Sequence, residues 1–118
     1  MASTLQTNAS AFPTFAVNAQ TTSYTFALTD ANNTFVTINN ASANTATIPP
    51  NSSVAFPVGT ILNFAQTGAG QTTITQGSGV TITSTGATAT APKTRVQYSA
   101  ATAIQTSANN WLVIGDIA

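Results

Sequence analysis

Turn-forming residues recur at short intervals along nearly the whole chain, and this spacing restricts the fold more than any other feature. Pairs such as Asn39-Asn40 and Pro49-Pro50 separate short stretches rich in Thr, Ile, Val and Phe. The intervals are roughly 8–12 residues, which suits strands and leaves little room for helices. Good helix formers are also scarce, because the chain has 4 Leu, 1 Lys and no Glu.

The stretches between these turns predict an all-β fold. Residues 24–28 alternate polar and apolar side chains and are expected to pair with 34–38 as a hairpin around a turn at 30–33. Further strands are predicted at 45–48, 60–66, 72–75, 80–83, 94–99, 102–106 and 111–114, with a loop at 84–92. About nine short strands at this spacing are typical of an antiparallel β-sandwich or barrel.

The first twenty residues differ from the rest of the chain. They contain Pro13 and three apolar residues, Phe12, Phe15 and Val17, that follow no sustained period. We therefore expect an extended N-terminal arm over residues 1–20 and one β domain over residues 21–118. The three apolar side chains have no place in the strand pattern, so they are the predicted contacts of the arm with a partner.

Charge is almost absent from this chain. Its charged side chains are Asp30, Lys93, Arg95 and Asp116, it has no His and no Cys, and Thr, Asn, Ser and Gln supply 52 of its 118 residues. Acid–base catalysis needs titratable groups placed together beside a substrate, whereas both Asp residues stand at turn positions, where a carboxylate caps the local backbone. We therefore expect no enzyme, no cofactor and no metal site.

Lys93 and Arg95 form the basic spot of the sequence. Two cations neutralise too few phosphates for nucleic-acid binding, and no stretch is long and apolar enough to span a membrane. On an alternating strand the two side chains point to the same side. They are expected either to be solubilising charges at a strand start or to form ionic contacts with Asp30 or Asp116 of a neighbouring subunit.

The predicted core is small. Val, Ile, Leu and Phe together number 25, and small domains often need further burial against copies of themselves. A surface with zero net charge does not oppose such association. We expect a homo-oligomer, with a trimer as the expected number.

Two aromatic residues, Trp111 and Tyr98, raise the question of sugar binding. Aromatic rings surrounded by amides and hydroxyls are the composition of sugar-binding surfaces. Trp111 opens the apolar run Trp-Leu-Val-Ile, so a core position is favoured for it. Tyr98 lies outside that run.

Several turn motifs follow one another in a fixed order along residues 22–118. They include Leu28-Thr-Asp-Ala-Asn, Ile48-Pro-Pro-Asn-Ser-Ser-Val-Ala-Phe-Pro-Val-Gly-Thr60, Thr67-Gly-Ala-Gly, Gly79-Val-Thr-Ile and Trp111-Leu-Val-Ile-Gly-Asp116. This series resembles a β-rich module of tailed-bacteriophage structural proteins, often found at the ends of tail fibres or in minor tail proteins. The resemblance implies a virion component and brings no catalytic residues with it. The segment 1–20 is outside the resemblance.

Two functions fit a virion component. A chain that starts at Met and carries only a short arm is expected to be a capsid decoration (cement) protein, which docks on the major capsid protein of the assembled shell and stabilises it. The alternative is a tail-fibre or head-fibre module that recognises a glycan or protein on the host surface. The first residues lack the pattern of a signal peptide, so synthesis in the host cytoplasm and location in the virion are expected.

Overall fold

A computed structural model describes residues 14–118, and its regular structure is almost entirely β-strand. It contains one 3₁₀ turn, η2 (Leu28–Asp30), and nine strands: β2 (Ala16–Gln20), β3 (Tyr24–Thr25), β4 (Thr34–Ile38), β5 (Asn44–Ile48), β6 (Ile61–Gln66), β7 (Thr72–Gln76), β8 (Thr81–Ser84), β9 (Ala100–Ser107) and β10 (Asn110–Gly115). The all-β prediction is confirmed. No helix in this part of the chain is long and apolar enough to cross a membrane.

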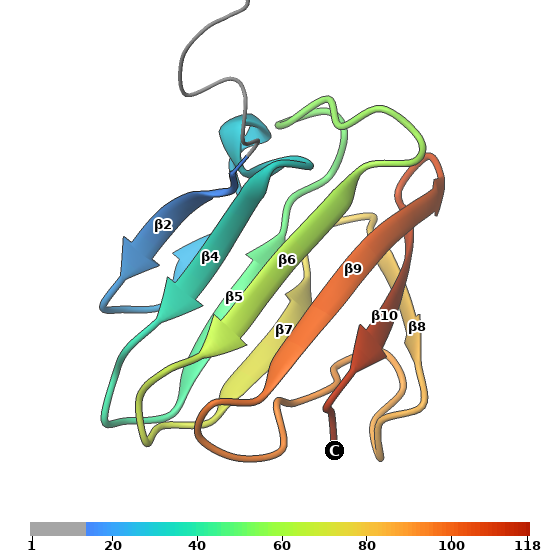
Figure 1. Ribbon diagram of the computed structural model, residues 1–118. Helices are drawn as coiled ribbons and strands as arrows, with labels where there is room; N and C mark the ends of the chain where they lie inside the picture. Colours follow the sequence, from blue (N-terminus) through green and yellow to red (C-terminus); the bar gives the residue numbers. More distant parts are fainter. Residues whose placement is uncertain (1–13) are drawn as a thin grey trace, which may run out of the picture.

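The strands form two sheets. One has six strands in the order β2-β4-β6-β9-β10-β8, and the other has three in the order β3-β5-β7. Figure 1 shows the larger sheet in front, with β5 and β7 behind it. From β2 to β8 the chain alternates between the sheets, like the successive turns of a β-solenoid.

This alternation overturns the predicted antiparallel arrangement. β2, β4 and β6 pair in parallel, as do β3, β5 and β7, and β8 pairs in parallel with β10. Within residues 14–118 the antiparallel strand pairs are β6–β9 and β9–β10. The predicted hairpin of 24–28 with 34–38 is also wrong, because β3 and β4 lie in different sheets. Turn residues mark where a chain bends, but they do not specify which sheet it enters next.

β2 lies within the segment that the sequence predicted to be an arm. Its residues pair with β4 from Ala16↔Thr34 to Gln20↔Ile38. Residues 16–20 therefore belong to the six-stranded sheet, and the β domain begins before the predicted boundary at residue 21. Residues 1–13 of the predicted arm, with Phe12, lie outside the described residues.

The predicted strand at 94–99 does not form either. Lys93 and Thr94 make isolated bridges to Thr73 and Ile117, and a turn follows in which the Ser99 N–H donates to the Val96 carbonyl at 3.0 Å. The Thr94 N–H also donates to the Thr72 carbonyl at 2.9 Å, so this segment covers the edge of β7 that no strand pairs with.

One hydrophobic core lies between the two sheets. The six-stranded sheet contributes Val36, Ile38, Leu62 and Phe64 among others, and the smaller sheet contributes Ala46, Ile48 and Ile74. Successive strand residues point to opposite sides. The residues between these core positions therefore face away from the core, and they form the surface considered next.

Candidate functional site

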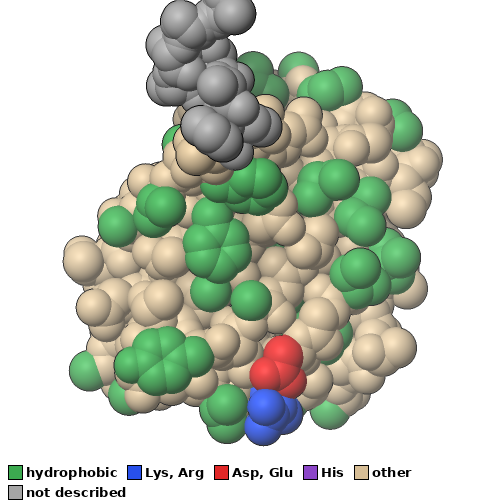
Figure 2. Space-filling model, viewed as in Figure 1, with side chains coloured by type: hydrophobic (Ala, Val, Ile, Leu, Met, Phe, Trp, Pro, Cys, Tyr) green, Lys and Arg blue, Asp and Glu red, His purple; other side chains and the backbone are tan. Residues whose placement is uncertain are grey.

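The side of the six-stranded sheet that faces away from the core is here called the outer face, and its strand residues carry no charge, while the Arg95–Asp116 ion pair lies at its edge beyond the end of β10. The strand registers place on the outer face Val17, Ala19, Phe35, Thr37, Ile61, Asn63, Ala65, Thr81, Thr83, Ala100, Thr102, Ile104, Leu112 and Ile114. Figure 2 shows apolar side chains scattered across this side, with one adjacent acidic and basic pair at the lower edge. The surface is therefore neutral and partly apolar.

The large apolar residues of the outer face are open to solvent to different degrees. Val17 is 67% exposed and Ile114 47%, while Ile61 and Leu112 are each 37% exposed. Phe35 is half-buried. These apolar side chains share one face of the sheet, which makes that face a candidate site of protein association.

Two polar side chains at the centre of the outer face form a hydrogen bond with each other. The Thr102 hydroxyl donates to the Asn63 side-chain oxygen at 2.7 Å, between β9 and β6. A polar group that already has a hydrogen bond costs less to bury than one that loses its water without replacement. These two oxygen atoms can therefore be covered at low cost by a partner that also accepts from the Asn63 amide N–H groups.

Asp30 is only 1% exposed, and its side chain has a structural role. Its carboxylate accepts hydrogen bonds from the Tyr24 hydroxyl at 2.6 Å, the Asn18 amide at 2.8 Å and the Ala27 N–H at 2.8 Å. Burial, and then the hydrogen bond to Asp30, raise the pKa of Tyr24 to about 12. The carboxylate thus ties η2 to β2 and β3, and a substrate does not reach it.

Asp116 is paired with Arg95 of the same chain. Arg95 Nε and Nη2 donate to the two carboxylate oxygens at 2.6 Å and 3.0 Å, and the Ser99 hydroxyl donates at 2.8 Å. The hydrogen bond from Arg95, helped by Ser99, lowers the pKa of Asp116 below its usual range, and Asp116 raises the pKa of Arg95. The inter-subunit contact predicted for Arg95 is thus not needed, because its acidic partner lies in its own chain.

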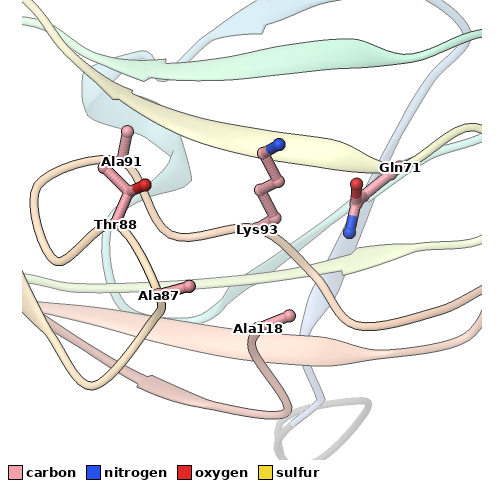
Figure 3. Close-up of a pocket in the computed structure, with 6 residues that line it drawn as sticks. All are labelled: Gln71, Ala87, Thr88, Ala91, Lys93 and Ala118. Carbon is pink, nitrogen blue, oxygen red and sulfur yellow. The ribbon is translucent and has the colours of Figure 1, made fainter.

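Lys93 points, like Arg95, to the exposed side, with buried Thr94 between them. It borders a small hollow of about 210 Å³ that Gln71, Ala87, Thr88, Ala91 and Ala118 also line. Figure 3 shows the short side chains of this hollow around the loop at 84–92 and the last residue. Its one titratable side chain is Lys93, so the hollow offers no acid–base pair.

Trp111 and Tyr98 have opposite environments. Trp111 is 1% exposed and packs edge-to-face on Phe56, with ring centroids 5.5 Å apart. It is therefore closed to a sugar ring. Tyr98 is 74% exposed, and its backbone φ is +72°.

The Tyr98 backbone angle is unusual for an aromatic residue. Tyr98 occupies the third position of the turn from Val96 to Ser99, where a positive φ normally selects Gly or Asn. Such strain costs on the order of 1–3 kcal/mol, and an exposed ring recovers little of it by burial in its own chain. No Gly occurs in residues 93–99 to signal this turn in the sequence.

The predicted arm contacts are only partly described. Phe15 is 54% exposed and precedes β2, Val17 lies on the outer face, and Phe12 lies outside the described residues. Nothing in the sequence marks Phe35, Ile61 or Ile114 as members of one exposed surface. The alternating pattern of each strand hints at two faces, but only the register places these residues on one surface.

Comparisons with known proteins identify no relative of this chain. No protein-family model, curated protein or solved structure matches the chain. Among residues 14–118, no three His, Cys, Asp or Glu side chains gather in a group that could hold a metal ion.

Proposed function

We propose that the protein is a non-enzymatic structural component of a tailed-bacteriophage virion. The observation that carries this proposal is that three of its four charged side chains are bonded within the chain. Asp30 is buried in a hydrogen-bond network and Arg95 is paired with Asp116, so the accessible surface is made largely of hydroxyls, amides and apolar groups. Such a surface packs on other proteins without the cost of desolvating charge. The ordered turn motifs of residues 22–118 support the virion as the location.

Within the virion, the proposed role is that of a decoration protein that docks on the assembled shell and stabilises it. The proposed contacts with the major capsid protein are Phe12, Phe15 and Val17. Phe15 and Val17 are more than half exposed, so burying each of them against a partner would contribute about 1.5–3 kcal/mol. This contribution is large enough to control docking.

A truncation tests the docking role, and its boundary matters. Removing residues 1–13 leaves β2 whole, whereas removing 1–20 would also delete Asn18, which donates to Asp30. The double variant Phe12→Ala/Phe15→Ala should keep its thermal melt and lose binding to capsids assembled without the protein. The protein lacking residues 1–13, which retains Phe15 and Val17, should keep its melt and bind those capsids more weakly. Leu28→Ala is the matched control, because Leu28 and Phe15 are both 54% exposed.

Two results would count against this proposal. Full occupancy of capsids by the Phe12→Ala/Phe15→Ala variant would reject docking through the N-terminal segment. Absence of the chain from purified virions, measured by mass spectrometry of the particles, would reject the virion role itself.

A receptor-binding module is the second candidate, and Tyr98 is the observation that favours it. A strained, exposed aromatic side chain at the tip of a turn is suited to contact a ligand outside the chain. Under this alternative, Tyr98→Ala should abolish binding to host cells or to an array of bacterial glycans. The truncation of residues 1–13 should then leave that binding unchanged.

A further inference from the structure

We propose that the outer face packs against the outer face of a second copy of this chain. The two copies are related by a two-fold axis that lies between their sheets, runs parallel to the strands and passes over the line between β6 and β9. The inference goes beyond the proposed function and does not depend on it. It assigns a two-fold pair, whereas the sequence predicted a trimer.

The registers of the sheet place matching residues at equal distances from that axis. Phe35 pairs with Asn63, Asn63 with Thr102, and Thr102 with Ile114, so these four residues form one row across β4, β6, β9 and β10. An axis between β6 and β9 sets Phe35 opposite Ile114 of the second copy. It also sets Asn63 opposite Thr102.

A second row repeats this match. Ile61 pairs with Ile104 across β6 and β9, so the same axis sets Ile61 of one copy opposite Ile104 of the other. In these three pairs apolar residues meet apolar residues, and polar residues meet polar residues. Each contact occurs twice, as an interface with two-fold symmetry requires.

Charge and hydrogen bonding favour a second copy as the occupant. Identical surfaces usually repel where they carry like charges, but the strand residues of the outer face carry none. In the polar centre the Thr102 hydroxyl donates to the Asn63 side-chain oxygen, which leaves the Asn63 amide N–H groups to donate across the interface. Two sheets that meet in this way keep their strands roughly aligned, which is a common geometry of sheet packing.

The size of the face is sufficient for a weak but specific pair. Six strands about 4.8 Å apart and roughly 17–20 Å long give a projected area on the order of 400 Å² per copy. Side-chain relief and flanking loops increase this area. The pair therefore lies near the lower limit of about 1,000 Å² of total buried surface for specific interfaces.

The opposite side of the molecule is a poorer candidate. The outward residues of the three-stranded sheet are mainly Thr, with Thr25, Thr47 and Thr75 in one row. The hydroxyls of Thr47 and Thr75 lie 2.7 Å apart and bond to each other. This side offers little apolar area, so it provides a location for a control variant.

Sedimentation velocity from low to high micromolar concentration tests the pair. The protein as it exists should pass from monomer to a species of twice its 11.9 kDa mass. Phe35→Glu or Ile114→Lys alone should raise the dimer Kd by about tenfold or more, since each places a charge against an apolar partner. Thr25→Lys, which adds the same charge to an exposed residue of the other sheet, should leave the Kd unchanged.

The double variant Phe35→Glu/Ile114→Lys gives the decisive result. Within one chain these side chains are separated by three strand spacings, about 14 Å, so they do not form an ion pair there. Across the proposed interface they meet, and the double variant should regain dimerisation in a salt-sensitive manner. If either charged variant melts early, the uncharged variant Ile114→Thr replaces it as the test. Thr suits a strand, so this variant should keep the fold and weaken the dimer.

Several outcomes would overturn the inference. These are a monomer at all concentrations, a trimer, a dimer insensitive to Ile114→Lys and Ile114→Thr, or single-variant losses that the double variant does not restore. None of them bears on the virion role. A monomer that still decorates capsids would leave the proposed function standing and remove only the two-fold pair.

Discussion

Tyr98 holds a backbone angle that its side chain disfavours, and this gives a prediction at the scale of one residue. Replacing Tyr98 by Gly removes the strain of φ +72° and loses little buried surface, because the ring is 74% exposed. We expect Tyr98→Gly to raise the free energy of unfolding by about 1 kcal/mol, after allowing for the greater freedom of Gly in the unfolded chain. Urea denaturation measures this change.

Tyr98→Ala separates strain from side-chain contacts. Ala keeps a Cβ and therefore most of the strain, so its free energy of unfolding should stay near that of the original protein. If Tyr98→Gly were instead clearly less stable than the original, the ring would have a structural role, and the case for a partner contact would fail.

Tyr24 predicts how stability changes at alkaline pH. Its pKa is raised to about 12 in the folded protein, compared with about 10 in an unfolded chain. The folded state therefore holds the proton more tightly, so the stabilising contribution is complete below pH 10 and is lost as the pH rises toward 12. The midpoint of urea unfolding should fall over this interval.

Tyr24→Phe isolates this effect. Phe has no hydroxyl to titrate, and it leaves Asp30 with one hydrogen bond fewer. The variant should be less stable at neutral pH by about 1–3 kcal/mol and should show a shallower alkaline decline. An equally steep decline in both proteins would contradict the assignment to Tyr24.

At the scale of elements, the two stacks of parallel strands bring successive turns into direct contact. The Gly70 N–H donates to the Asn40 carbonyl at 2.8 Å, so the turn after β6 lies on the turn after β4. A Cβ at Gly70 would overlap the Ser42 carbonyl group. This contact between turns is part of the register that places the outer-face residues in rows.

Gly70→Ala should therefore destabilise the protein strongly, by about 3 kcal/mol or more, because backbone atoms must move to make room. Gly79→Ala is the matched control: Gly79 has φ +82°, but nothing lies within 4 Å of its added Cβ, so about 1–2 kcal/mol of strain alone is expected. Thermal and urea unfolding measure both changes. Equal losses would mean that the turn contact is unimportant.

The elements themselves were predicted with unequal success, for a physical reason. The strand at 34–38 has the predicted bounds, because its alternating side chains and flanking turns determine it locally. The strand predicted at 24–28 is cut to Tyr24–Thr25, since Asp30 draws the Ala27 N–H into the 3₁₀ turn. The segment 94–99 turns instead of pairing, and no local signal marks that turn.

At the scale of the whole molecule, most strand pairs join segments that are far apart in the chain. Asn63 pairs with Thr102, for example, and β3 and η2 lie between the paired strands β2 and β4 in the chain. Loop closure must precede such contacts, which slows folding. Refolding by stopped-flow fluorescence of Trp111 should occur in roughly milliseconds to seconds, and microsecond refolding would contradict this view.

The all-β class, the positions of most strands and the scarcity of charged side chains could be read from the order of residues along the chain. These properties follow from local alternation, turn chemistry and residue counts, which do not depend on how distant segments meet. The parallel pairing of neighbouring strands, the place of residues 16–20 in the sheet, and the row shared by Phe35, Asn63, Thr102 and Ile114 became visible in the three-dimensional fold alone. The physical reason is that register and sheet membership are set by packing between segments far apart in the chain, and a turn motif specifies a bend without specifying its partner.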